Sequence, residues 1–331
     1  MIKAIVPVAG IGSRLRPHTH TQPKALIPVA GKPIIAHITD ILIEQGITEI
    51  VYVIGYLGDK IQQFITQNYP NIHAHFILQT NGKGVGHAIW LAKDFVKPED
   101  ELFILFGDTI IETDLQKVIC SKTSSIAVKK VGNPTLFGVA QINAQNMITN
   151  LVEKPSIPKS NMAMIGAYYI KEATELMQVL ETQITETEKQ EYTLTDALMQ
   201  MINNGIPMSV FNVDKWFDCG KKEILLETNA TLLKKEKYKR PDVAKYPDTV
   251  FIDPVFIAEG CRIKASIIGP NVSIGEHAIV ENSIIKNSII GPNAHLEYAI
   301  LDASLIGNDA YLRGMIQKLN LGDSTEINYS T

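Results

Sequence analysis

The sequence predicts an α/β protein with a mostly parallel, Rossmann-like sheet and helices on both faces, followed by a short parallel β-helix of hexapeptide repeats. Three observations lead to this prediction. Short apolar runs alternate with longer segments, as in strand–helix–strand units. The first run ends in a glycine-rich turn, and a Ser-Ile-Ile-Gly-Pro-Asn motif recurs late in the chain. We expect a first domain over 1–239, a linker over 240–250 and a β-helix domain over 251–331.

The first part of the chain supplies the parallel strands. Apolar runs predict strands over 4–8, 49–54, 74–78 and 102–106, and helices are expected over 33–46, over 58–67 and up to about residue 95. Pro33 suits a first helical turn and Gly46 suits a helix end. The glycine turn, the loop that begins at Gln79 and Asp108 each follow one of these strands. Ligands bind at the carboxyl ends of such strands, so one crevice should gather all three.

The next part predicts a mixed continuation of the sheet. Strand-like pieces over 125–131, 137–142, 148–152 and 164–170 alternate with Gly, Asn and Pro turns. A helix is expected over 171–181, then an exposed polar loop over 182–191. Thr193 then caps a helix to Asn203. A strand over 207–213 and a long helix over 222–238 complete the domain.

The last part of the chain is repetitive. The motif copies begin at Ser266, Ser288 and Ser304, and an aliphatic residue returns every five to six positions between them. This rhythm is typical of a parallel β-helix, in which each coil stacks its apolar residues on the next. The polar residues 320–331 are expected to cap the stack or to fray.

Composition excludes several classes of protein. The 331 residues carry a formal charge of -4, and 45% of them are hydrophobic. No apolar run reaches the ~18 residues of a membrane span, and the three cysteines lack disulfide or metal spacing. The acidic balance argues against a nucleic-acid partner. We therefore expect a cytoplasmic protein without membrane or nucleic-acid partners.

The amino-terminal turn concentrates positive charge. No acidic residue precedes Asp40, whereas Arg14, Arg16 and Lys24 follow the turn closely. Backbone N–H groups in such a turn can hold phosphate oxygens, so the region suits a polyanion. Leu15 stands where a dinucleotide-binding fingerprint needs its third glycine, and no Gly-Lys pair of a P-loop follows.

The string from Gly10 through Gly12-Ser13-Arg14-Leu15 to Pro23-Lys24 resembles the signature of sugar-1-phosphate nucleotidyltransferases. Specific motifs extend the resemblance over roughly residues 1–235, and the repeat rhythm extends it further. It implies attack of a sugar-1-phosphate oxygen on the α-phosphorus of a nucleoside triphosphate, with pyrophosphate leaving.

The resemblance also implies roles for particular residues. The catalytic cations would be Arg14 and Lys24, and the Mg²⁺ ligands would be Asp108 and Asp218. The nucleotide-binding set would be Ala9, Gly10, Gly12, Ser13, Gln79 and Gly84. The sugar-phosphate set would be Gly138, Glu153, Lys154 and Gly166.

Several of these residues have a plainer interpretation that the sequence leaves open. Lys24 could be a solvated surface lysine, Asp108 a helix cap, and Asp218 a turn residue. Glu153 and Lys154 could form an exposed ion pair, Gln79 could serve only its loop, and Gly138 and Gly166 could allow close strand packing.

The resemblance favours glucose-1-phosphate with dTTP or UTP as substrates and Mg²⁺ as cofactor. A mannose-1-phosphate guanylyltransferase, a bifunctional enzyme that also transfers acyl groups, and a silent regulatory subunit stay as alternatives. His277 and His295 are the candidate bases for acyl transfer, whereas a silent subunit would lack one of the four residues Arg14, Lys24, Asp108 and Asp218. Lys221 departs from the family, which often has Thr there. The β-helix is expected to hold a homo-oligomer together.

Overall fold

The computed structural model describes residues 1–235 and 242–314, which divide into two compact units between Thr228 and Asn229. This division falls inside the helix α7 (Lys222–Leu233), whereas the sequence places the linker at 240–250, so the domain boundaries stay a prediction. The expected tail at 320–331 and the end of the expected helix 222–238 lie outside the described residues.

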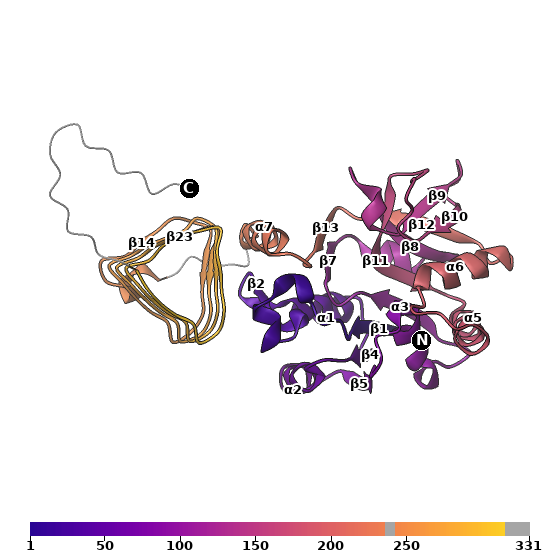
Figure 1. The fold of residues 1–331 in the computed structure, drawn as a ribbon, viewed down its shortest axis with the longest axis horizontal. Coiled ribbons are helices and arrows are strands. Elements are labelled where there is room, and N and C mark those ends of the chain that lie inside the picture. The colour runs from indigo at the N-terminus through magenta and orange to yellow at the C-terminus, as the bar shows by residue number, and fades with distance from the viewer. Residues whose placement is uncertain (236–241, 315–331) are drawn as a thin grey trace. The chain divides into compact units, whose positions relative to one another are not determined.

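The first unit is built on a nine-stranded sheet (Figure 1). Strand β1 (Ile2–Val8) lies between β4 (Glu49–Ile54) and β6 (Glu101–Leu105) and is parallel to both. Strand β5 (His73–Leu78) extends the parallel part beyond β4. The chain leaves β1 toward β4 on one side and later returns to β6 on the other. The loops after β1 and β6 therefore flank a topological switch point, where such sheets bind ligands.

Helices cover both faces of this parallel part. The face that carries Tyr52 is covered by α1 (Ile34–Glu44), and the Thr39 and Tyr52 hydroxyls are 2.9 Å apart. Beyond α2 (Gly58–Asn68), the Tyr69 hydroxyl donates to Asp40 of α1 over 2.8 Å. The opposite face, with Val51 and Val53, packs against α3 (Gly84–Leu91). The prediction that helices cover both faces of the sheet is confirmed.

The rest of the sheet is mixed, as predicted. Strand β11 (Met162–Ile170) is antiparallel to β6, to β8 (Ser124–Lys130) and to β9 (Val139–Ile142). Strand β10 (Ile148–Val152) pairs antiparallel with β9, and β12 (Met208–Asn212) pairs parallel with β8. Residues of α5 (Ala173–Glu186) and α6 (Leu194–Asn203) fill the core on the α3 side.

The expected loop over 182–191 is partly wrong, because α5 continues to Glu186. The buried Gln183 explains the difference, since its amide donates to Gln200 of α6 over 3.0 Å. A polar contact between two helices leaves no apolar signal in the sequence.

Smaller elements complete the first unit. The two-stranded sheet of β7 (Thr109–Glu112) and β13 (Lys215–Asp218) is antiparallel, and neither strand was predicted. The remaining strands and α-helices are the hairpin β2 (Pro28–Val29) and β3 (Lys32–Pro33), α4 (Leu115–Ile119) and α7 (Lys222–Leu233), inside which the two units divide.

The second unit contains the predicted β-helix, whose triangular coils are stacked in Figure 1. Register partners are 17 or 16 positions apart, as with Val250–Ile267 and Ile284–Ile300. Each coil contributes one strand to each of three parallel sheets. The first sheet consists of β14 (Val250–Phe251), β17 (Ile267–Ile268), β20 (Ile284–Lys286) and β23 (Ile300–Asp302). The second consists of β15 (Val255–Ile257), β18 (Val272–Ile274), β21 (Ile289–Ile290) and β24 (Leu305–Ile306). The third consists of β16 (Arg262–Lys264), β19 (Ile279–Glu281), β22 (His295–Glu297) and β25 (Tyr311–Arg313).

The β-helix is stabilised by stacked aliphatic residues and by polar ladders at its corners. Ile268 and Ile285 are fully buried and in register. At a corner, Asn287 has a left-handed backbone, accepts from the Asn271 amide over 2.9 Å and donates to Asp302 over 2.9 Å. Asparagine tolerates this backbone conformation better than most residues. No helix within 1–235 or 242–314 is long and apolar enough to cross a membrane.

Candidate active site

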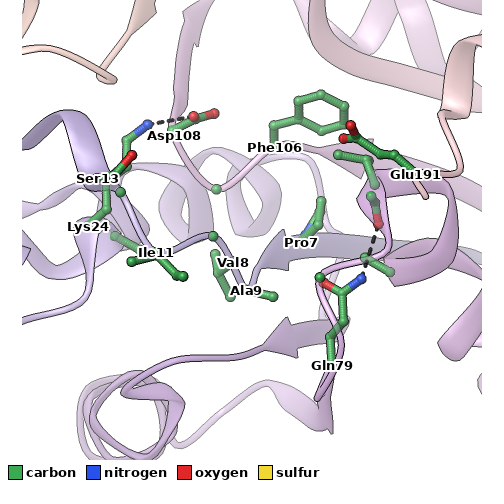
Figure 2. A pocket seen from close by; sticks show the side chains of 18 residues that line it. Pro7, Val8, Ala9, Ile11, Ser13, Lys24, Gln79, Phe106, Asp108 and Glu191 are labelled. Carbon is green, nitrogen blue, oxygen red and sulfur yellow. Dashed lines mark hydrogen bonds and ion pairs between the residues drawn. The ribbon is translucent and has the colours of Figure 1, made fainter.

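Two adjacent cavities open in the first unit beside the ends of β1 and β6. The first has a volume of about 430 Å³ and the second about 620 Å³. Both are lined by Val85, Phe106, Asp108 and Glu191. Figure 2 shows the first cavity, with the glycine turn and Lys24 at one end and Gln79 at the other.

The glycine turn brings Lys24 close to the first cavity. Gly12 has a left-handed backbone with φ of 68°, and a Cβ there would lie only 3.0 Å from the Lys24 Cβ. The Thr19 hydroxyl donates to the Gly12 carbonyl over 2.9 Å and fixes the turn. A side chain at position 12 would therefore be strained and would push Lys24 away. Gly10 differs, since nothing lies within 4 Å of the place of its Cβ.

Lys24 reaches across to the end of β6 (Figure 2). Its Nζ lies 2.6 Å from Oδ2 of Asp108, and its side chain is only 12% exposed. Asp108 follows Gly107, where a Cβ would lie 2.1 Å from Cγ1 of Val8 on β1. The glycine thus lets the two strand ends approach and brings cation and carboxylate together. Neither a solvated lysine nor a simple helix cap describes this pair.

Asp218 joins the same cluster from a distant part of the chain. On β13 it stands opposite Thr109 of β7, and the Cys219 amide donates to the Asp108 carbonyl over 2.9 Å. Burial raises the pKa of Asp218, and the negative charge of Asp108 raises it further, while Lys24 and Arg14 lower it. The two carboxylates therefore interact, and both line the second cavity.

Arg14 extends from the glycine turn to the end of β13. A Cβ on Gly220 would lie 3.0 Å from Nη2 of Arg14 and 2.9 Å from Oδ1 of Asp218. Gly220 thus leaves room for the guanidinium beside the carboxylate. Because Arg14 lines the second cavity and Lys24 the first, the turn supplies one cation to each.

The donor set at Asp108 and Asp218 fits a hard divalent cation. Within the parts of the chain that the structure describes, no cluster of three or more His, Cys, Asp or Glu residues could hold a metal. The protein would thus supply two carboxylates, and substrate phosphates and water the rest, as Mg²⁺ commonly accepts. The raised pKa of Asp218 reflects a burial and repulsion that a cation would relieve.

Gln79 and Gly84 form the far end of the first cavity. The Gln79 amide nitrogen donates to the Gly84 carbonyl over 3.1 Å and lies 3.1 Å from Nδ1 of His87. Gly84 has a φ of 89°, and a Cβ there would lie 2.5 Å from Cγ of Glu191. The Gly86 amide donates to the Tyr192 carbonyl over 2.8 Å. The segment at Glu191 and Tyr192 therefore packs on the start of α3 and forms a wall of the cavity.

Glu153 and Lys154 line the second cavity together with Gly138 and Gly166, the two glycines of the expected sugar-phosphate set. The Thr195 hydroxyl donates to the Glu153 carboxylate, whose Oε1 lies 3.7 Å from Nζ of Lys154. A Cβ on Gly138 would lie 2.9 Å from Oε2 of Glu153. A Cβ on Gly166 would lie 2.8 Å from the Phe106 ring, and that backbone has a φ of 81°. Both glycines thus allow the Glu153 and Phe106 side chains to lie against the backbone that lines the cavity.

The expected site residues separate between the two cavities. The first is lined by Ala9, Gly10, Gly12, Ser13, Lys24, Gln79 and Gly84, and the second by Arg14, Gly138, Glu153, Lys154, Gly166 and Asp218, while Asp108 lines both. Sequence reasoning missed the lining residues Phe106, Phe137, Tyr168, Glu191, Thr195 and Trp216. The sequence gives no signal for these residues, because aromatic residues in apolar strands are normally core residues. Glu191 lies in a segment that was expected to be an exposed loop.

Comparisons with known proteins match both parts of the chain. The family described as Nucleotidyl transferase matches residues 3–235, and the family described as GlmU-like, C-terminal hexapeptide matches residues 242–312.

Individual relatives cover most of the chain. The low-salt glycan biosynthesis nucleotidyltransferase Agl11 of Haloferax volcanii is 33% identical over a match that covers 87% of each protein. A glucose-1-phosphate thymidylyltransferase of Streptomyces griseus is 27% identical over the full length of both proteins. A solved UDP-glucose pyrophosphorylase with bound UDP-glucose has a TM-score of 0.61 and 25% identity, over 71% of this chain and 100% of that one.

Proposed function

The chain belongs to the nucleotidyl transferase family of sugar-1-phosphate nucleotidyltransferases, and we propose that it transfers the nucleotidyl group of dTTP or UTP to glucose-1-phosphate, with release of pyrophosphate. The carrying observation is a pair of cavities that share Asp108, one cavity beside the glycine turn and the other beside Glu153. The substrate choice is supported by the glucose-1-phosphate thymidylyltransferase and UDP-glucose pyrophosphorylase to which the chain is similar.

In this proposal the nucleotide occupies the first cavity. Its base lies at Gln79 and Gly84, and its triphosphate lies against Ala9, Gly10, Gly12 and Ser13. The sugar-1-phosphate occupies the second cavity, with its hydroxyls at Glu153 and its phosphate at Lys154. The shared wall at Asp108 is then the place where the two phosphate groups meet.

The reaction needs charge neutralisation more than proton transfer. A phosphate oxygen of the sugar-1-phosphate forms a bond to the α-phosphorus, the bond from that phosphorus to the oxygen bridging to the β-phosphate breaks, and pyrophosphate leaves. Because the second pKa of such a phosphate is ~6, the nucleophile is ionised at neutral pH without a general base. Lys24 and Arg14 bring positive charge to the reacting groups and align them.

We propose that Asp108 and Asp218 together hold Mg²⁺. When bound, the ion would offset negative charge on the phosphates and help to orient them. The protein's own part is to keep both carboxylates beside Lys24 and Arg14, which limit their mutual repulsion.

The test is a substrate panel. Purified protein is incubated with Mg²⁺, each nucleoside triphosphate and each of several sugar-1-phosphates, and pyrophosphate is measured. We expect the fastest release with glucose-1-phosphate and dTTP or UTP. Faster release with GTP and mannose-1-phosphate would refute the substrate choice, and no release with any pair would refute the activity itself.

We also propose that the β-helix joins copies of the chain into a homo-oligomer. One outer face carries an in-register ladder of exposed aliphatic side chains, Val250, Ile267, Ile284 and Ile300, with exposed fractions of 56%, 38%, 43% and 80%. Such contiguous apolar surface favours association. Light scattering after size exclusion should give a multiple of 36.6 kDa, and Ile284→Asp with Ile300→Asp should lower it. A monomeric wild type would refute this proposal.

A further inference from the structure

Lys221 is a cation of the second cavity to which the proposed reaction assigns no role. It follows Gly220 at the turn between β13 and α7, and its side chain is exposed. The second cavity is lined by Lys221 together with Arg14, Lys154 and Asp218. Lys221 thus adds a third positive charge to this cavity, after those of Arg14 and Lys154.

The charge of Lys221 is uncompensated among the described residues. Lys24 pairs with Asp108 over 2.6 Å, and Lys154 lies 3.7 Å from Glu153. Arg14 lies beside Asp218 and lowers the pKa of that carboxyl. No ion pair or side-chain hydrogen bond within residues 1–235 and 242–314 includes Lys221. At the second cavity, Lys154 is thus paired with Glu153 and the charge of Arg14 acts on Asp218, whereas the Lys221 ammonium can meet an incoming anion without leaving a carboxylate.

The position of Lys221 in the cavity indicates which part of a substrate it meets. It adjoins Gly220, whose missing side chain leaves room for the Arg14 guanidinium and the Asp218 carboxylate. The sugar end of the cavity is instead defined by Glu153, to which Thr195 donates, and by Gly138. Lys221 therefore belongs to the end of the cavity where charged groups gather.

We propose that Lys221 binds the phosphate group of the sugar-1-phosphate, as a second cation in addition to Lys154. This inference rests on the proposed function, since it assigns one further contact to the same substrate. The phosphate is close to a dianion at neutral pH and can accept from more than one ammonium group. Lys221 acts on binding of this substrate and leaves the nucleotide contacts to Lys24 and the glycine turn.

The test compares Lys221→Ala with Lys122→Ala. Lys122 is an exposed lysine of the same unit that lines neither cavity. One lost charge-assisted contact at a partly hydrated site should raise KM for glucose-1-phosphate about tenfold. KM for the nucleoside triphosphate should stay within about twofold. Lys221→Arg should bind nearly as wild type, because arginine keeps the positive charge. Lys221→Gln should behave like Lys221→Ala, because glutamine keeps a polar side chain but loses the charge.

Calorimetry gives a readout that needs no turnover. Lys221→Ala should bind glucose-1-phosphate about tenfold more weakly, and Lys122→Ala should bind it as wild type does. Equal binding by wild type and Lys221→Ala, or a rise in KM confined to the triphosphate, would overturn the proposal. Wild-type protein that does not bind glucose-1-phosphate would also overturn it. If wild type binds but releases no pyrophosphate, the proposed function fails while this comparison still decides the role of Lys221.

Discussion

Replacing Lys24 with methionine tests the electrostatic design of the site most directly. The substitution keeps an unbranched side chain of similar length but removes the charge 2.6 Å from Asp108. At an effective dielectric of about 20, the direct attraction over that distance is about 6 kcal/mol, most of which desolvation of the two groups offsets. Asp108 is 35% exposed, so water screens the charge left behind. We expect Lys24→Met to destabilise the first unit by about 2 kcal/mol.

That loss is large enough to measure. For a unit of this size it corresponds to a fall of about 4–8 °C in the melting temperature, which calorimetry resolves. Adding Asp108→Asn should recover most of the stability, because the carboxylate that repels Asp218 is then neutral. Neither variant should release pyrophosphate at more than about one hundredth of the wild-type rate. An unchanged melting temperature in Lys24→Met, or a double variant less stable than the single one, would refute this reasoning.

The other predictions concern single features of the two units. Asp108→Asn should lower pyrophosphate release at least about a hundredfold while circular dichroism stays unchanged, and retained activity would contradict a role in metal binding. The pKa of Asp218 is raised in the folded protein, so its protonated form contributes stability that is full below about pH 3.9 and lost as pH rises through the folded pKa. The stability advantage of Asp218→Asn over metal-free wild type should therefore grow over that window, and a constant difference would contradict the shift. Gly84→Ala, with a φ of 89° and a Cβ 2.6 Å from the Tyr192 carbonyl, should raise KM for the triphosphate about tenfold and leave KM for the sugar-1-phosphate nearly unchanged. Ile285→Ala should destabilise the β-helix by about 3 kcal/mol in chemical denaturation, because it leaves a cavity in a fully buried stack, and a loss below about 1 kcal/mol would contradict close packing.

The parallel half of the sheet and the β-helix could be predicted because their signals are local. Buried parallel strands are continuous apolar runs, and the coils repeat an aliphatic rhythm that few other folds require. The end of α5 could not be predicted, since Gln183 is held by Gln200, a partner that only the fold brings near. Strand β7 was missed for a similar reason: it forms a sheet only with β13, which lies about a hundred residues later.

The candidate site shows the same division between local and distant information. The glycine turn and Lys24 lie within one short stretch, so a motif can represent them. Glu191 could not be identified, because it becomes a cavity wall only through the backbone contacts between Tyr192 and the start of α3. The proximity of Asp108 and Asp218 follows from the pairing of β7 with β13, which nothing in the local sequence of either residue reveals.

The arrangement of the cavities explains why the class of reaction is easier to infer than the substrates. Asp108 lies where the cavities meet, with Lys24 on one side and Arg14 and Asp218 on the other. In the proposed function these groups act on phosphates, which every substrate pair of such a reaction contains. The base would meet Gln79 and Gly84, which line only the first cavity, and the sugar would meet Gly138 and Glu153, which line only the second. Substitutions in either set can change one substrate without disturbing the shared charged groups, so a motif built on those groups identifies the reaction while leaving base and sugar to be measured.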